Sequence, residues 1–288
     1  MNQCSILLQL QQLLNDSVPT RPLIDVLAPM STLRAEYENG SASFLKQIDW
    51  LIARGFDRVR RTRGDGDCFY RSLGFAYVES LINSQDRDFA VASSLSKLES
   101  TKDTLDKAGI EKLVYEDFYE EFVSLIEGIT KPDAQGLVLN SDRLLHAFQS
   151  PETSNAIVIY LRFLTSAQIR LNREDFEAFV VHPDTKEPMD VDSFCANVVQ
   201  AMGKEAGEIA SSTSIAMQVL IYDSVEDNVE MEALCRALQL NVDVAYLSGV
   251  RGDGVDFITF RHDTDSKAPP LTLLYRPGHY DILFKQAA

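Results

Sequence analysis

The chain has 288 residues, of which 45% are hydrophobic, so it is long enough to bury a large core within one globular unit. It carries 43 acidic and 27 basic residues, and a net charge of -16 argues against nucleic acid and favours a partner with a basic face. No apolar run reaches the roughly 18 to 20 residues that span a bilayer, and the first residues lack a secretory signal. We therefore expect a soluble cytoplasmic protein with no membrane partner. The nucleus is left open as a second location.

The first predicted element is a short amphipathic helix. Ile6, Leu10 and Leu14 follow helical spacing, and helix-stopping residues come directly afterwards. We expect residues 1–20 to form an N-terminal helix or arm, followed by one domain over residues 21–288. The helix could pack on the body of the domain or detach and dock a partner, and the sequence leaves both open.

Three further elements follow in the first quarter of the chain. A second amphipathic helix is predicted from Ser41, closed by Gly55, and the alternation in residues 56–62 predicts a strand. A Gly-rich turn at residues 63–67 comes next, after which apolar positions repeat with helical period from Cys68 onward. The cysteine is therefore expected where a loop becomes a helix.

The middle of the chain is helical by pattern, and strands return near the end. Helices are predicted around Phe89–Leu105, Phe118–Ile129, Ile157–Ile169 and Phe194–Met202. Short strands are predicted at Val242–Leu247, Phe257–Phe260, Leu271–Tyr275 and Tyr280–Phe284. Residues 203–227 could be a surface excursion or an added strand. Helices before strands predict an α+β fold, with helices packed around a small, mostly antiparallel sheet.

Four cysteines, Cys4, Cys68, Cys195 and Cys235, lie far apart and form no C-x-x-C pair. This spacing favours neither a disulfide framework nor a zinc site, and we expect no metal and no organic cofactor. One of these residues could instead be a reactive thiol.

The strongest local signal is the run Gly64-Asp65-Gly66-Asp67-Cys68. Two glycines let the backbone bend so that several N–H groups converge, as a developing oxyanion requires. A cysteine at the following helix N-terminus feels the positive end of the helix dipole, which favours the thiolate. The run therefore predicts an activated nucleophile, which needs a base.

His279 is the best candidate for that base. It begins the last predicted strand, and strand side chains alternate faces, so His279 and Asp281 project to the same side. Asp281 could then hold one imidazole nitrogen and leave the other to take the proton of Cys68. The other histidines, expected to be structural or surface residues, are His146, His182 and His262.

The two motifs RGDGDCFYRSLGF and LLYRPGHYDILFK resemble the otubain branch of the OTU cysteine proteases, which are deubiquitinases. The likeness continues through SFLKQIDWLIARGFDRVRRTRGDG and IVIYLRFLTSAQIRLNREDFEAFV, and it spans the chain from about Pro22 to Lys285. The resemblance implies an OTU-like, papain-type fold. It also implies that Cys68 is the nucleophile, His279 the general base and Asp281 the residue that orients the imidazole.

The same resemblance extends to the loop and to the partners. It counts Asp65 with the active site and assigns the backbone around Gly66 and Asp67 to the oxyanion hole. It implies ubiquitin and polyubiquitin as substrates, and some family members also bind ubiquitin-conjugating enzymes, partly through an N-terminal arm. Two alternatives stay open: a noncatalytic module that binds ubiquitin or a conjugating enzyme, and a protease for another ubiquitin-like modifier.

Two departures from the family pattern stand out. The family usually has asparagine directly before the cysteine, whereas this chain has Asp67. A carboxylate beside the thiolate would tend to disfavour it, so activity is expected to be reduced or shifted in pH, and Asp67→Asn to raise the thiolate fraction. The second departure is a longer segment between MGKEAGE and Met231, which could alter how ubiquitin is gripped.

Overall fold

A computed structural model describes residues 21–183, 185–201, 223–249 and 254–285. The predicted arm at residues 1–20, and residues 203–222 of the segment left open above, lie outside the described residues. Within the described ranges, no helix is long and apolar enough to cross a membrane.

One six-stranded sheet organises the molecule, with the strand order β1-β2-β6-β5-β3-β4. The strands are β1 (Ile24–Pro29), β2 (Phe56–Thr62), β3 (Asn241–Tyr246), β4 (Asp256–Arg261), β5 (Leu271–Arg276) and β6 (His279–Lys285). Neighbouring strands are antiparallel except β3 and β5, which are parallel. The predicted α+β class with a mostly antiparallel sheet is therefore confirmed.

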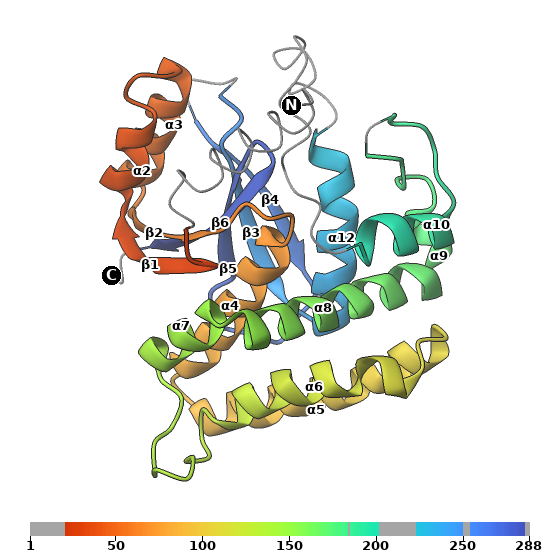
Figure 1. Ribbon diagram of the computed structural model, residues 1–288. Helices are drawn as coiled ribbons and strands as arrows, with labels where there is room; N and C mark the ends of the chain where they lie inside the picture. Colours follow the sequence, from red (N-terminus) through yellow and green to blue (C-terminus); the bar gives the residue numbers. More distant parts are fainter. Residues whose placement is uncertain (1–20, 184, 202–222, 250–253, 286–288) are drawn as a thin grey trace, which may run out of the picture.

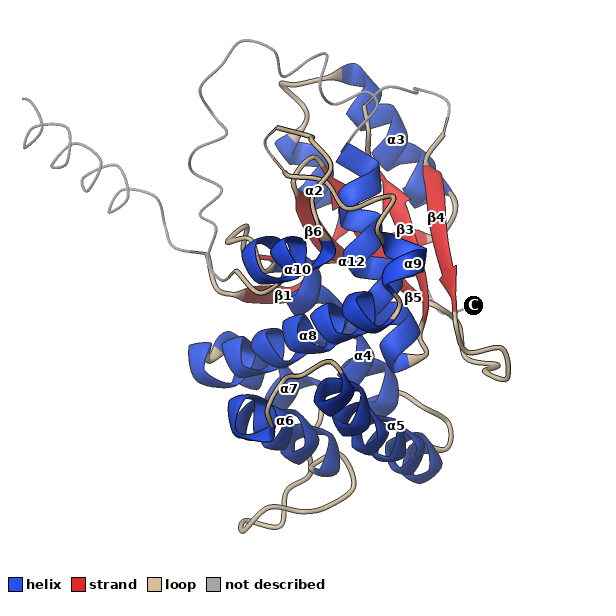
Figure 2. Ribbon diagram, turned by 90° about the vertical axis from the view of Figure 1, so that its right-hand side faces the viewer, coloured by secondary structure: helices blue, strands red, loops and turns tan. Residues whose placement is uncertain are grey.

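Helices cover both faces of this sheet (Figure 1). Their bounds are α2 (Met30–Glu36), α3 (Ala42–Ala53), α4 (Cys68–Ile82), α5 (Arg87–Lys107), α6 (Lys112–Glu127), α7 (Ser141–Gln149), α8 (Pro151–Leu171), α9 (Arg173–Phe176), α10 (Val191–Phe194) and α12 (Asp223–Leu238). A π-helical turn (Cys195–Val199) continues α10, so the single helix predicted at Phe194–Met202 is replaced by two shorter pieces. Figure 2 shows α8 between the sheet side of the molecule and the pair α5 and α6.

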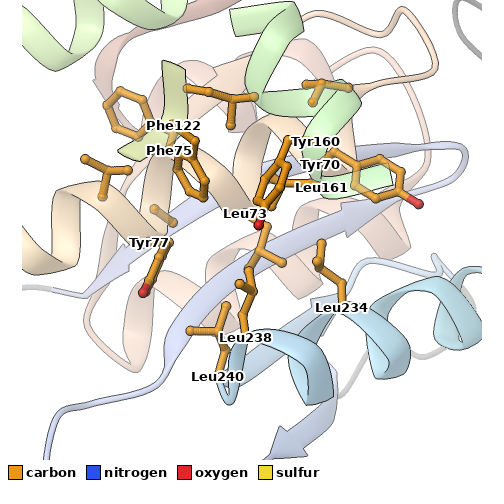
Figure 3. Packing of buried hydrophobic residues seen from close by; sticks show 14 of the residues in the cluster. Tyr70, Leu73, Phe75, Tyr77, Phe122, Tyr160, Leu161, Leu234, Leu238 and Leu240 are labelled. Atoms are coloured by element: carbon orange, nitrogen blue, oxygen red, sulfur yellow. The ribbon is translucent and has the colours of Figure 1, made fainter. Parts of the chain in front are cut away.

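Alternation along the central strands separates two of the three hydrophobic clusters among the described residues. Leu273 and Tyr275 of β5 pack into the larger cluster with α4, whereas Leu274 between them packs into a second cluster with α2 and α3. Figure 3 shows part of the larger cluster, where side chains of α4, α6, α8 and α12 meet. Strand β6, which begins at the candidate base, likewise packs on both faces, with Tyr280 and Ile282 in the larger cluster and Leu283 in the second.

Helix α4 is the central support of the fold, because every residue except Ser80 is buried. A helix that is buried on all sides must be enclosed by neighbours, here the sheet on one side and α7 and α8 on another. Gly74 allows the close approach of α8, since a Cβ there would lie 3.3 Å from Leu161 Cδ1 and 3.4 Å from Ile157 Cγ2. The first residue of this enclosed helix is Cys68.

Candidate active site

Cys68 lies where the sequence predicted it, at the first position of α4 directly after the Gly-rich loop. Cys68 is only 6% exposed, and the helix that it begins packs against β6. The first N–H groups of a helix have no partner within the helix and carry a partial positive charge. A thiolate at this position is therefore stabilised by the backbone itself.

His279 and Asp281 project to the same side of β6, as the alternation predicted. His279 Nε2 donates to Asp281 Oδ1 at 2.8 Å, and the Asp281 side chain is fully buried. The Thr62 backbone N–H donates to the same oxygen at 3.1 Å, and Arg276 Nη2 donates to Oδ2 at 2.7 Å. Asp281 is thus held by two neighbours, Thr62 and Arg276, besides the His279 imidazole.

The electrostatics of this trio favour a charged imidazole. Burial opposes the charged form of His279, but its hydrogen bonds to Asp281 and Cys68 raise its pKa to about 9. Burial likewise opposes the Asp281 carboxylate, yet His279 and Arg276 hold the pKa of Asp281 below its usual value. Because Nε2 is held by Asp281, the nitrogen left for Cys68 is Nδ1. At neutral pH the arrangement therefore favours the imidazolium form of His279 beside Cys68.

The loop before Cys68 is ordered by its own aspartate. Gly66 has a φ of 81°, in the left-handed region that favours glycine. Asp65 Oδ1 accepts from the Asp67 N–H at 3.1 Å, and both carboxylate oxygens accept from Arg71 Nη1, at 2.7 and 2.9 Å. Asp65 therefore holds the loop in shape. An oxyanion that binds the Asp67 N–H competes with this carboxylate, and the oxyanion role of Gly66 and Asp67 stays a prediction.

The Asp67 side chain is not a free carboxylate beside the thiolate. Arg162 Nη2 donates to Asp67 Oδ1 at 2.6 Å and Arg162 Nε at 3.1 Å, while Arg71 Nη2 lies 3.8 Å from Oδ2. The expectation that Asp67 reduces the activity or shifts its pH dependence did not take this ion pair into account. Two guanidinium groups offset the charge that the sequence alone assigned to the neighbourhood of Cys68.

Next to His279 lies an open cavity of about 450 Å³. It is lined by Arg21, Tyr37, Phe44, Thr62, Arg63, Gly64, Arg276, Pro277 and His279. A Cβ at Gly64 would lie 3.4 Å from His279 Nδ1, so the glycine leaves the reacting nitrogen uncovered on this side. A substrate can approach the imidazole from this cavity.

Sequence reasoning missed Arg276 and Arg162. Arg276 could have been found, because the Pro277-Gly278 turn is two residues long and pairs Arg276 with His279 across the hairpin. Arg162 carried a weaker signal, a lone charge within the apolar run of α8. The three other histidines lie elsewhere, and the described residues contain no group of three or more His, Cys, Asp or Glu side chains that could hold a metal ion.

Comparison with protein families gives a match to peptidase C65 otubain over residues 16–221 and 214–285. An Arabidopsis thaliana protein named ovarian tumor domain-containing deubiquitinating enzyme 1 is 33% identical over 274 residues, which cover 91% of this chain and 81% of that protein. Human ubiquitin thioesterase OTUB2 is 32% identical over 256 residues, with 88% and 92% covered. Human ubiquitin thioesterase OTUB1 is 29% identical over 283 residues, with 98% and 90% covered.

Solved structures give the same result at the level of the fold. The complex of h/ceOTUB1 with ubiquitin aldehyde and UBC13~Ub contains a chain that matches with a TM-score of 0.74 and 25% identity, covering 98% of both chains. The corresponding complex with UBCH5B~Ub matches with a TM-score of 0.74 and 26% identity, again over 98% of both. These matches confirm the OTU-like fold that the sequence motifs predicted.

Proposed function

The chain belongs to the peptidase C65 otubain family, and from this membership we propose that it is a deubiquitinating cysteine protease. Its reaction is hydrolysis of the isopeptide bond between the C-terminus of ubiquitin and a lysine side chain. Relatives named ubiquitin thioesterase or deubiquitinating enzyme support this activity. The observation that carries it is the placement of Cys68 at the start of α4 near His279, whose imidazole is held by the buried Asp281.

In the acylation step the Cys68 thiolate attacks the carbonyl carbon of the isopeptide bond. The carbonyl oxygen takes up negative charge, and we assign the stabilisation of that charge to the N–H groups at the start of α4 and in the loop before it. The imidazolium of His279 gives its proton to the lysine nitrogen as the C–N bond breaks. The products of this step are the free lysine amine and a thioester between Cys68 and ubiquitin.

In the deacylation step a water molecule replaces the lysine. Neutral His279 takes a proton from the water, whose oxygen attacks the thioester carbonyl. The C–S bond then breaks, which releases the ubiquitin carboxylate and restores the thiolate. Asp281 keeps the imidazole in one orientation through both steps, because its hydrogen bond to Nε2 leaves Nδ1 directed at the reacting atoms.

The proposal is tested by incubating the wild-type protein and Cys68→Ala with a panel of linkage-defined diubiquitins and following monoubiquitin release over time. We expect cleavage by the wild type alone, and the panel reports the linkage preference at the same time. Cleavage by Cys68→Ala would refute the assignment of the nucleophile. Failure of both proteins to cleave, with ubiquitin binding retained, would identify a noncatalytic module, and absence of binding would direct the search to another ubiquitin-like modifier.

Binding of a ubiquitin-conjugating enzyme is a second candidate function. It is favoured by the two solved complexes described above, since one contains UBC13~Ub and the other UBCH5B~Ub, and the matching chain covers 98% of this one in both. The test is the affinity of Cys68→Ala for UBC13, free and charged with ubiquitin, measured by biolayer interferometry. We expect tighter binding of the charged form, and equal, negligible binding of both forms would exclude this function for that enzyme.

A further inference from the structure

Arg162 is a buried arginine whose guanidinium contacts the loop of residues 64–67 before Cys68, which we call the nucleophile loop. The residue lies in the middle of α8 and is 5% exposed. Nη2 and Nε donate to Asp67 Oδ1, Nη2 also donates to the Gly66 carbonyl at 2.8 Å, and Nη1 donates to the Val199 carbonyl at 2.6 Å. Every guanidinium nitrogen therefore has an acceptor, and two of the three act on the residues directly before Cys68.

The charges around this guanidinium are balanced. Arg162 lies over the Tyr70 ring at 4.5 Å, and the Tyr70 hydroxyl donates to Glu230 of α12. On the loop side, the two carboxylates of Asp65 and Asp67 face the two guanidiniums of Arg71 and Arg162. A buried carboxylate without such a partner would be strongly destabilised and would repel a neighbouring thiolate.

The contact with the Gly66 carbonyl fixes a second property of the loop. A trans peptide is planar, so its carbonyl oxygen and its N–H point in opposite directions. With the Gly66 carbonyl held by Arg162, the N–H of Asp67 is directed away from Arg162, where it meets Asp65 Oδ1. Arg162 thereby sets the orientation of one of the peptide groups assigned to the oxyanion hole.

We propose that Arg162 is a positioning residue for the nucleophile loop, and that its ion pair with Asp67 is what allows this chain to carry an aspartate directly before its nucleophile. Only the activity assay of this inference rests on the proposed function. The inference also concerns the reactivity of Cys68 itself, which is measured without ubiquitin. It reverses the expectation drawn from the sequence, since Asp67→Asn alone should change little while Arg162 is present.

A double-mutant cycle tests the ion pair. Arg162→Met keeps an unbranched side chain but leaves Asp67 without its main partner, and we expect diubiquitin cleavage to fall on the order of 100-fold. Asp67→Asn should stay within about threefold of the wild type, and adding it to Arg162→Met should recover about tenfold or more. Arg170→Met is the matched control, since Arg170 lies on the same helix and pairs with Asp192 instead.

The second readout is the rate at which iodoacetamide alkylates Cys68 as a function of pH, mapped by peptide mass spectrometry. Charged and titratable groups surround the loop on all sides, and the cycle changes only Asp67 and Arg162. The groups left unchanged are His279, Asp281, Arg71, Asp65, Tyr70 and Glu230. We expect slower alkylation at neutral pH in Arg162→Met, rescue by Asp67→Asn, and a wild-type profile for Asp67→Asn alone. This assay needs no ubiquitin, so it stands even if the wild type cleaves none of the diubiquitins.

Three results would overturn the inference. One is an Arg162→Met variant that behaves like Arg170→Met in both assays, and another is a double variant as impaired as Arg162→Met. The third is a shift of the alkylation profile in Asp67→Asn alone, which would show that the carboxylate is not compensated. This last measurement decides the question even where circular dichroism shows that Arg162→Met does not fold, because Asp67→Asn keeps Arg162 in place.

Discussion

Asp281 is a fully buried carboxylate at the end of a short chain of polar contacts. His279 Nε2 and the Thr62 N–H meet one of its oxygens, and Arg276 meets the other. Arg276 Nη1 in turn lies 3.4 Å from Glu36 Oε2 on α2, so the orientation of the imidazole depends on residues beyond Cys68, His279 and Asp281. Removal of one partner of a buried charge leaves the other unpaired, which is costly at this site.

Arg276→Met should therefore weaken catalysis without abolishing substrate binding. We expect kcat to fall by about 10-fold to 100-fold with KM within about twofold, because a loosely held Asp281 no longer fixes the imidazole. Steady-state kinetics on a cleaved diubiquitin measure the change. Arg58→Met, on an exposed side chain of β2, serves as the control and should match the wild type. A wild-type kcat in Arg276→Met would contradict this role.

The raised pKa of His279 also predicts how stability depends on pH. A group whose pKa is higher in the folded state stabilises the fold fully below its unfolded value, 6.5, and loses this effect as the pH rises through about 9. The contribution is up to about 3 kcal/mol. The free energy of unfolding, measured in urea at about pH 6 and about pH 9.5, should differ more between wild type and His279→Gln at the lower pH. An equal gap at both values would contradict the raised pKa.

The triad was predictable because its signals are local. Cys68 follows a Gly-rich turn, and His279 and Asp281 are two residues apart on one strand. The charge state around Cys68 was not predictable, because it depends on Arg162, nearly a hundred residues away in the chain. A single sequence gives no measure of which arginine meets which aspartate across the core.

At the scale of elements, α4 links the candidate nucleophile to the rest of the fold. Arg60 and Glu79, both buried, form an ion pair at 3.2 Å that joins β2 to this helix. On another side Phe75 meets Phe148 of α7 edge to face, with ring centroids 5.3 Å apart. The position of Cys68 is therefore determined by several neighbours that do not touch substrate.

Gly74→Val tests the close packing of α4 on α8. The added methyl groups would press on Leu161 and Ile157, whose side chains lie within 3.4 Å of the position that a Cβ would occupy. Overpacking of this kind costs about 1 to 3 kcal/mol. Urea denaturation should show that loss. Gly74→Ala is the control, because its single methyl requires a smaller adjustment and alanine favours the helix. A Gly74→Val protein as stable as the wild type would show that the interface between α4 and α8 accommodates the larger side chain without cost.

Elements with a clear local pattern were predicted. The apolar repeat of α3 and α8 follows directly from their buried faces, and β5 and β6 are short β-rich runs bounded by turn residues. In contrast, β1 and α2 were not predicted, because the strand ends at Pro29 and the helix is only seven residues long. The parallel pairing of β3 with β5 was equally hidden, since β4 intervenes in the chain.

On the scale of the whole molecule, the net charge of -16 predicts a salt-dependent encounter with a substrate that presents a basic face, as ubiquitin does. Raising NaCl from about 50 mM to about 500 mM should lower kcat/KM for diubiquitin about threefold to tenfold and leave kcat nearly unchanged. Alkylation of Cys68 by iodoacetamide, a neutral reagent, is the control and should vary little. A salt-independent kcat/KM would show that long-range charge does not assist binding.

The most direct test of the central claim is the covalent capture of ubiquitin by Cys68. Ubiquitin with a C-terminal electrophile is incubated with the wild type, Cys68→Ala and His279→Gln, and the products are identified by intact mass and peptide mapping. The account predicts one ubiquitin per wild-type chain, attached at Cys68, none on Cys68→Ala, and slow labelling of His279→Gln. Labelling at another cysteine, or no labelling of the folded wild type, would contradict it.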